Sequence, residues 1–403
     1  MLSQLLKLAA ADNLTIAIAS ERLRGARLMS GRMSSEFRPV LGAHGTPVSN
    51  PDNSASFFQA GFDATWELGL FGRSRSNRTL ARGDVALASA DLRAARVVVR
   101  AEVTRSYIGL RSEQERHRAL QDAIQLAQRL QYLLMRRMAL GLGTRQPLDQ
   151  ATELLLGLQS AQSRSEETVS RHAEELALLL GLTMPDSNWL RSEATPSVNI
   201  IDQHSVEETP ADVLRSRPDV LRAEQQMLIA AAQLDRAQSE LYPSVSIVGS
   251  LSAAFRSVGH LRRTPGNLLS IGPIIDLPLF DWSMRRAARD AHGSDLRATS
   301  LAYRQAVLEG LADAESALAT LNSTGQNLHN EQQLLDRRAS VAQAAERSQQ
   351  RQLAGEIEIL DARLAVLEAT RRVSEAREQQ CYAYIALRKA LGDTLEIPES
   401  GAG

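Results

Sequence analysis

Apolar and polar residues alternate along the chain from Phe57 to Phe71. The apolar positions are the even ones and the polar positions the odd ones: Phe58, Ala60, Phe62, Ala64, Trp66, Leu68 and Leu70 against Gln59, Gly61, Asp63, Thr65, Glu67 and Gly69. A period of two predicts a β-strand with one apolar face. The run is too long for a usual sandwich strand and fits a membrane-spanning barrel strand, which needs about 9–11 tilted residues.

The period changes to that of a helix at Arg73 and continues to about Leu140 without a proline. At about 1.5 Å per residue this is roughly 100 Å of helix, a length typical of coiled-coil assemblies rather than globular domains. The stretch from Gly141 to Pro147 ends this helix, and a second helical pattern follows. Together the two helices predict a tall antiparallel hairpin.

The same order of elements occurs twice, which predicts a mainly α fold with a β part, built from a duplicated strand–strand–helix–helix unit. The predicted domains are a first repeat at 1–182, an irregular segment at 183–215, a second repeat at 216–392 and a C-terminal tail at 393–403. The expected elements are a helix at 1–35, a β-hairpin at 37–71 and helices at 73–140 and 148–180, then a helix at 218–241, a β-hairpin at 243–280 and helices at 284–353 and 357–391.

Equivalent positions of the two repeats keep a nearly constant spacing, as a duplication requires. Gly143 and Gly355, in the predicted helix-hairpin turns, are 212 residues apart. Phe71 and Phe280, where strand passes into helix, are 209 residues apart. A few insertions and deletions explain the difference.

All seven phenylalanines fall in the two predicted β-hairpins, together with Trp66, and Trp282 follows directly after the second hairpin. Aromatic girdles at the lipid interfaces are typical of membrane barrels. The alternative is the general preference of strands for aromatic residues. The serine-rich face from Ser244 to Ser252 favours the barrel, because it suits a watery lumen better than a packed core. The expected aromatic and lipid-facing residues are Phe58, Phe62, Trp66 and Phe255.

Composition and motifs exclude several functional classes. The formal net charge of −1 argues against nucleic-acid binding. The single cysteine, Cys381, excludes intrachain disulfides and multi-cysteine metal sites. The seven histidines form no HExxH-type pair, and neither a P-loop nor a Gly-x-Ser-x-Gly elbow occurs. We therefore expect no enzymatic activity, no cofactor and no bound metal.

The sequence offers no run of about 18 apolar residues that could form a transmembrane helix. Met1 to Lys7 lack the pattern of an export signal and resemble the middle of a helix. Two interpretations follow: a cytosolic protein, or a chain that is truncated at its N-terminus and whose true start lies upstream.

Four stretches carry a resemblance to a known family: Phe62–Arg73, Leu214–Val220, Leu241–Ser246 and Gly272–Asp281. The Gly-x5-Asp turns at Gly143/Asp149 and Gly355/Asp361 complete the set. In this order and spacing the chain resembles the TolC-like outer-membrane efflux proteins, in particular the NodT/OprM-type subgroup.

The resemblance implies a homotrimer that shares one β-barrel in the outer membrane and one α-helical tunnel in the periplasm. Four strands cannot close a barrel and lipid does not tolerate an open sheet edge, so the physics also requires oligomerisation. The implied partners are a periplasmic adaptor protein, an inner-membrane pump and outer-membrane lipid. Members begin with an export signal, often with a lipid-bearing cysteine, and neither stands at the start of this chain.

The resemblance places a periplasmic aperture at the helix-hairpin turns, with Gly143, Asp149, Gly355, Asp361 and Arg363 as its candidate residues. Both glycines are expected at positive φ. For Asp149 a helix-capping role is favoured over lining the gate, whereas for Asp361 both roles stay open. Arg363 departs from the family pattern, which has an aliphatic pair and a second acid after the aspartate.

The predicted seam between barrel and tunnel comprises Phe71, Gly72, Pro278, Phe280 and Asp281, with Pro278 ending the second sheet ladder. The expected function is a passive exit duct of a tripartite system that exports drugs or other small molecules, gated at the periplasmic helix tips. The exit duct of a protein (type I) secretion system is one alternative. A soluble coiled-coil scaffold is another, and a periplasmic adaptor is disfavoured because it would carry only one helical hairpin.

Overall fold

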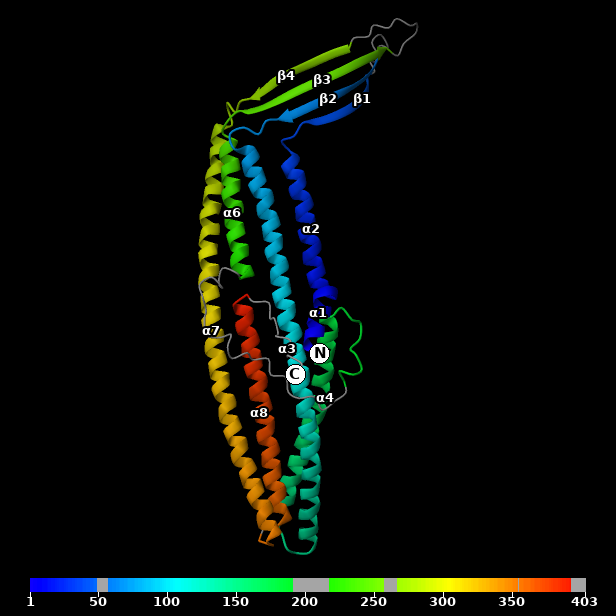
Figure 1. The fold of residues 1–403 in the computed structure, drawn as a ribbon, viewed down its shortest axis with the longest axis vertical. Helices are drawn as coiled ribbons and strands as arrows, with labels where there is room; N and C mark the ends of the chain where they lie inside the picture. Colours follow the sequence, from blue (N-terminus) through cyan, green and yellow to red (C-terminus); the bar gives the residue numbers. More distant parts are fainter. Residues whose placement is uncertain (49–56, 191–216, 257–266, 354, 393–403) are drawn as a thin grey trace, which may run out of the picture. The chain divides into compact units, whose positions relative to one another are not determined.

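The computed structural model describes residues 1–48, 57–190, 217–256, 267–353 and 355–392 (Figure 1). The chain divides into two compact units. Unit 1 contains 1–18, 93–218 and 308–403, and unit 2 contains 19–92 and 219–307. Each unit therefore combines segments of both predicted repeats, because the long helices contribute to both units.

Unit 2 contains a four-stranded antiparallel sheet in the order β1-β2-β3-β4. The strands are β1 (Val40–Val48), β2 (Phe57–Glu67), β3 (Ser244–Arg256) and β4 (Asn267–Asp276). The central pairing joins the two hairpins, with Phe62 opposite Leu251 and Asp63 opposite Ser250. The rest of unit 2 is helical: most of α2 (Leu14–Ser35) and α6 (Pro218–Ser239), and the N-terminal parts of α3 (Arg73–Ala139) and α7 (Trp282–Gln350).

Unit 1 is a helical assembly of α1 (Leu2–Asp12), α4 (Arg145–Leu179), α8 (Glu356–Ala390) and the distal parts of α3 (Arg73–Ala139) and α7 (Trp282–Gln350). One core cluster joins α3, α7 and α8 through Ile108, Leu321 and Tyr384. Cys381 belongs to this cluster, is 2% exposed and fills the place of a small apolar residue. A second cluster joins α3, α4 and α8 near the hairpin turns.

The strands and long helices begin and end within a few residues of the predicted bounds, with one exception. The predicted helix at 1–35 is wrong, because two helices meet at Asn13. Asn13 is extended, at φ −67° and ψ 124°, and its Oδ1 accepts from the amides of Thr15 at 2.9 Å and Ile16 at 3.2 Å. Its Nδ2 donates to the carbonyl of Leu179 at 2.8 Å. Asn13 thus caps α2 and anchors the helix break to the end of α4.

No helix in the described residues combines the length and apolar character needed to cross a membrane.

We expect Asn13→Ala to lower the free energy of unfolding by about 1–2 kcal/mol, because the mutant loses both the cap and the bond to Leu179. Asn13→Ser keeps a capping oxygen but cannot reach the Leu179 carbonyl as a donor, so its loss should be smaller. Denaturant unfolding of the purified protein measures both values. Equal stability of wild type and Asn13→Ala would contradict the capping role.

Candidate functional site

The turn between α3 and α4 is closed by backbone hydrogen bonds around Gly141. Gly141 has φ +69°, and its amide donates to the carbonyl of Met138 at 3.0 Å. The amide of Leu142 donates to the carbonyl of Arg137, also at 3.0 Å. This is the Schellman pattern, in which a left-handed residue ends a helix. The positive φ predicted for Gly143 is wrong, because the left-handed position is taken two residues earlier.

The turn between α7 and α8 has the same hydrogen bonds around a residue that is not glycine. Gln352 has φ +61°, and its amide donates to the carbonyl of Gln349 at 2.7 Å. The amide of Leu353 donates to the carbonyl of Ser348 at 2.9 Å. Gly355 is extended at φ −85° and ψ 159° and precedes α8 as its N-cap, so its predicted positive φ is also wrong.

Neither predicted aspartate acts as a cap. Thr144 is the N-cap of α4 and makes no side-chain capping bond, while Asp149 lies one turn inside the helix. Its Oδ2 is 3.5 Å from Nε of Arg145 on the exposed surface, so the favoured capping role is wrong. Asp361 lies more than one turn inside α8, and partial burial raises the pKa of its carboxyl group. Lining of a gate by Asp361 stays a prediction.

Two ion pairs join helices of unit 1 near the hairpin turns, one between the two hairpins and one within the second hairpin. The guanidinium of Arg129 on α3 binds Glu356 at the start of α8 with two hydrogen bonds, of 2.8 and 3.2 Å. Arg363 on α8 binds Oε1 of Glu346 on α7, with its Nε at 2.9 Å and Nη2 at 2.7 Å. Arg363 was a predicted site residue, but its partner Glu346 was not predicted. The pair of Arg129 with Glu356, 227 residues apart, was not predicted either.

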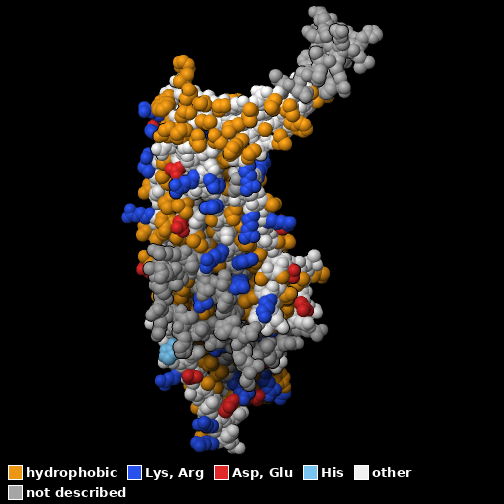
Figure 2. Space-filling model, turned by 45° about the horizontal axis from the view of Figure 1, so that its top comes forward, with side chains coloured by type: hydrophobic (Ala, Val, Ile, Leu, Met, Phe, Trp, Pro, Cys, Tyr) orange, Lys and Arg blue, Asp and Glu red, His pale blue; other side chains and the backbone are white. Residues whose placement is uncertain are grey.

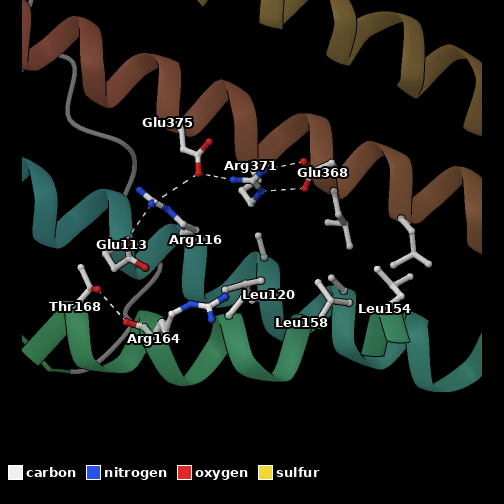
Figure 3. Close-up of a pocket in the computed structure, with 15 residues that line it drawn as sticks. Glu113, Arg116, Leu120, Leu154, Leu158, Arg164, Thr168, Glu368, Arg371 and Glu375 are labelled. Carbon is white, nitrogen blue, oxygen red and sulfur yellow. Dashed lines mark hydrogen bonds and ion pairs between the residues drawn. The ribbon is translucent and has the colours of Figure 1, made fainter. Parts of the chain in front are cut away.

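A cavity of about 550 Å³ lies between α3, α4 and α8 (Figure 3). Its wall includes Leu120, Leu154 and Leu158, and charged residues follow one side. Arg371 lies between Glu368 and Glu375, and Arg116 is 2.7 Å from Glu378 and 3.2 Å from Glu113. Hydrogen bonding to Arg371 lowers the pKa of Glu368. Of these pairs, that of Arg116 with Glu378 joins α3 to α8, and the others lie within one helix. No catalytic constellation is present among these side chains.

The sheet of unit 2 has one apolar and one polar face. Register places Phe62 beside Ala43 and Leu251, and on the opposite face Asp63 beside Gly42 and Ser250. The apolar side chains are exposed: Phe58 45%, Phe62 55%, Trp66 38%, Leu269 73% and Ile271 75%. Figure 2 shows hydrophobic side chains gathered over the sheet. Predicted Phe255 pairs with Phe58 in register, but its side chain lies outside the described residues.

On the polar face, Nδ1 of His44 on β1 is 2.7 Å from Oδ2 of Asp63 on β2. The described residues contain no group of three or more His, Cys, Asp or Glu side chains that could hold a metal ion.

The seam from β2 to α3 uses left-handed residues. Gly69, Phe71 and Gly72 have φ of +57°, +55° and +90°. A Cβ on Gly69 would lie 2.6 Å from the ring of Phe37, so glycine is required there. The ring of Phe71 stacks on Tyr242 at 5.1 Å, which supports its strained backbone.

The seam from β4 to α7 has no positive φ among its residues. β4 ends at Asp276, Pro278 follows two residues later, and α7 begins after Asp281. Oδ2 of Asp281 is 2.6 Å from Nε of Arg285, whose Nη1 donates to the Glu240 carbonyl at 2.8 Å. Phe280 is 99% exposed.

The fold is that of solved outer-membrane channels. The structure superposes on the outer-membrane channel OprN with a TM-score of 0.85 at 23% identity, covering 97% of this chain and 89% of OprN. For CusC the TM-score is 0.81 at 20% identity, covering 97% and 92%. The mainly helical fold with an antiparallel sheet is therefore confirmed, while barrel closure and the trimer stay predictions.

The family model described as "Outer membrane efflux protein" matches residues 8–182 and 209–393, and the chain belongs to this family. Nodulation protein T of Rhizobium leguminosarum bv. viciae is 26% identical over 326 residues, covering 77% of this chain and 65% of that protein. The pyoverdine export outer membrane protein OpmQ of Pseudomonas aeruginosa is 23% identical over 295 residues, covering 73% and 61%. The chain thus spans less than two thirds of both relatives. The family resemblance and the outer-membrane localisation are confirmed.

We expect Gly141→Ala to lower the free energy of unfolding by about 1–2 kcal/mol, because a Cβ is disfavoured in the left-handed region. Gly143→Ala is the matched control: a Cβ there meets Arg137 no closer than 3.5 Å, an ordinary contact. Its effect should stay within about 0.5 kcal/mol. Chemical denaturation compares the two variants, and equal losses would contradict this assignment of the turn.

Proposed function

We propose that the protein is the passive exit duct of a tripartite efflux system, with a β-barrel shared by three copies and a gate at the periplasmic helix tips. The amphipathic sheet carries this proposal. Its exposed apolar side chains would bury against lipid at roughly 25 cal/mol per Å², and its polar face would line a watery lumen.

The free edges of the sheet support a shared barrel. In the described sheet β1 and β4 each have a single neighbour. Their outer backbone groups would be unpaired in lipid, which has no water to satisfy them. Pairing β4 of one copy with β1 of the next removes every edge, and three copies would supply twelve strands. The exposed apolar face also argues against a soluble scaffold, which would have to bury it.

The tip ion pairs support a gate. The bond between Arg129 and Glu356 joins the two hairpins, and both side chains are close to half exposed. Exposed ion pairs contribute little to stability, so they can break and re-form during opening. Asp361 and Arg363 on α8 would line the same region.

The names of the relatives favour small cargo. They include a solvent efflux pump protein, SrpC of Pseudomonas putida, and the cation efflux protein CusC of Escherichia coli. We assign this chain a small-molecule cargo, with a periplasmic adaptor and an inner-membrane pump as partners. No observation in the described residues favours protein secretion.

Single cysteines on opposite faces of the sheet test the barrel. In a Cys381→Ala background, Asp63→Cys and Ser250→Cys should react with a water-soluble maleimide in proteoliposomes. Phe62→Cys and Leu251→Cys, one residue away on paired strands, should react at least about tenfold more slowly, because the thiolate does not form in lipid. A soluble scaffold would give equal rates on both faces.

Single-channel recordings in planar bilayers test the gate. We expect Arg129→Gln and Glu356→Gln each to raise the open probability about two- to fivefold, because each removes the link between hairpins. The exchange Arg129→Glu with Glu356→Arg should restore closure. Arg145→Gln, which breaks an exposed pair within α4, is the control and should leave gating unchanged. Unaltered gating in both single variants would remove this pair from the gate.

A further inference from the structure

Arginines recur within the first eight residues of both long helices, directly after the seams. α3 contains Arg75 and Arg78, and α7 contains Arg286 and Arg289, so the same Arg-x-x-Arg spacing recurs 211 residues later. Neither helix has an acidic residue in its first turn. Acidic residues stabilise that position and basic ones oppose the helix dipole, so helix stability does not explain the arrangement.

The positive charge of this group is mostly uncompensated. The guanidinium of Arg75 has no partner among the described residues, and that of Arg78 binds only the neutral Ser74, at 3.0 and 3.2 Å. Arg286 lies over the ring of Trp282, 5.7 Å from its centroid. Arg289 alone pairs with an acid, Asp290. The neighbouring Arg73 and Arg285 differ, because each is held by a carboxylate.

Exposed aromatic rings stand beside these arginines. Phe71 is 52% exposed, Trp282 43% and Phe280 99%, and all three lie at the two connections from the sheet to these helices. Figure 2 shows basic side chains on the helices next to the hydrophobic side chains of the sheet. Aromatic rings at headgroup level, followed by arginines whose stems lie along apolar surface, are typical of a membrane boundary.

We propose that Arg75, Arg78, Arg286 and Arg289, here called the arginine collar, bind the phosphates of anionic phospholipids at the periplasmic boundary of the outer membrane. The planar guanidinium matches two phosphate oxygens, and an anionic lipid offers the charge that the protein leaves uncompensated. This inference rests on the proposed membrane barrel. It adds a lipid preference that a barrel alone does not require.

Spin-labelled lipids measure this preference directly. The full-length protein is reconstituted in phosphatidylcholine bilayers with a trace of labelled phosphatidylglycerol or labelled phosphatidylcholine, and electron paramagnetic resonance gives the motionally restricted fraction of each. We expect phosphatidylglycerol to associate about threefold more strongly than phosphatidylcholine. The quadruple Arg→Gln collar variant should bring this ratio to about one, as should salt near 1 M, where the Debye length is about 3 Å.

The control variant removes four exposed arginines from the same two helices farther from the seams: Arg93, Arg96, Arg304 and Arg337, each replaced by glutamine. It should keep the wild-type ratio. Variants of one helix alone, R75Q/R78Q and R286Q/R289Q, should each lose part of the preference and guard against misfolding of the quadruple variant. Far-UV circular dichroism verifies their helix content.

The outcomes separate the two proposals. A restricted component with no phosphatidylglycerol preference in the wild type overturns the arginine collar and leaves the barrel intact. A preference that survives in the quadruple variant also overturns it. No restricted component with either lipid would mean that the sheet is not in the bilayer, which contradicts the proposed channel itself.

Discussion

The need to pair backbone hydrogen bonds away from water dominates this structure. A strand edge in lipid leaves its N–H and C=O groups unsatisfied, and each such group costs several kcal/mol. The sheet offers an apolar face for lipid but keeps two open edges. The length of the strands and their alternating residues suit a sheet in lipid, and the proposed shared barrel would pair the two edges. In the helices the same requirement is fulfilled within each helix, because the backbone N–H and C=O groups bond to one another.

The interactions that hold the helices of unit 1 together differ along the length of the helices. Around Ile108 and Cys381 the core is apolar and buried, with Leu321 and Tyr384 in the same cluster. Near the turns, the contacts between hairpins combine exposed ion pairs, such as that of Arg129 with Glu356, with a smaller apolar cluster that includes Leu130 and Leu360. Buried apolar contacts are costly to separate, whereas exposed ion pairs exchange with water at little cost. Movement at the tips thus separates a smaller apolar cluster than movement around Ile108 would.

The sequence was sufficient for the features that depend on periodicity. Alternation from Phe57 to Phe71 predicted β2 and its two faces, and the 3.6-residue period predicted α3 and α7. Family motifs supplied the class of channel. Features that depend on single backbone angles were not predictable in the same way. Gly143 was predicted to have a positive φ, but the left-handed position in this turn is taken by Gly141, just after the helix.

Contacts between distant residues were also beyond the sequence. Nothing local marks Glu356 as the partner of Arg129, or Leu179 as the acceptor for Asn13. Asn13 itself does carry a local sign, since asparagine is a preferred N-cap, but the apolar period continues across it and conceals the break. The composition of the two compact units depends on where long helices pass each other, which no repeat pattern encodes.

The pairing of β2 with β3 has a consequence for how the chain is made. Residues 57–67 receive their partner only when residues 244–256 have been synthesised, close to two hundred residues later. Until then the first hairpin has an open edge and an apolar face in water, the state most prone to aggregate. Such distant pairing also slows folding, because the entropy of closing the loop must be overcome first. Holding the nascent polypeptide unfolded until its second half is complete would avoid this state.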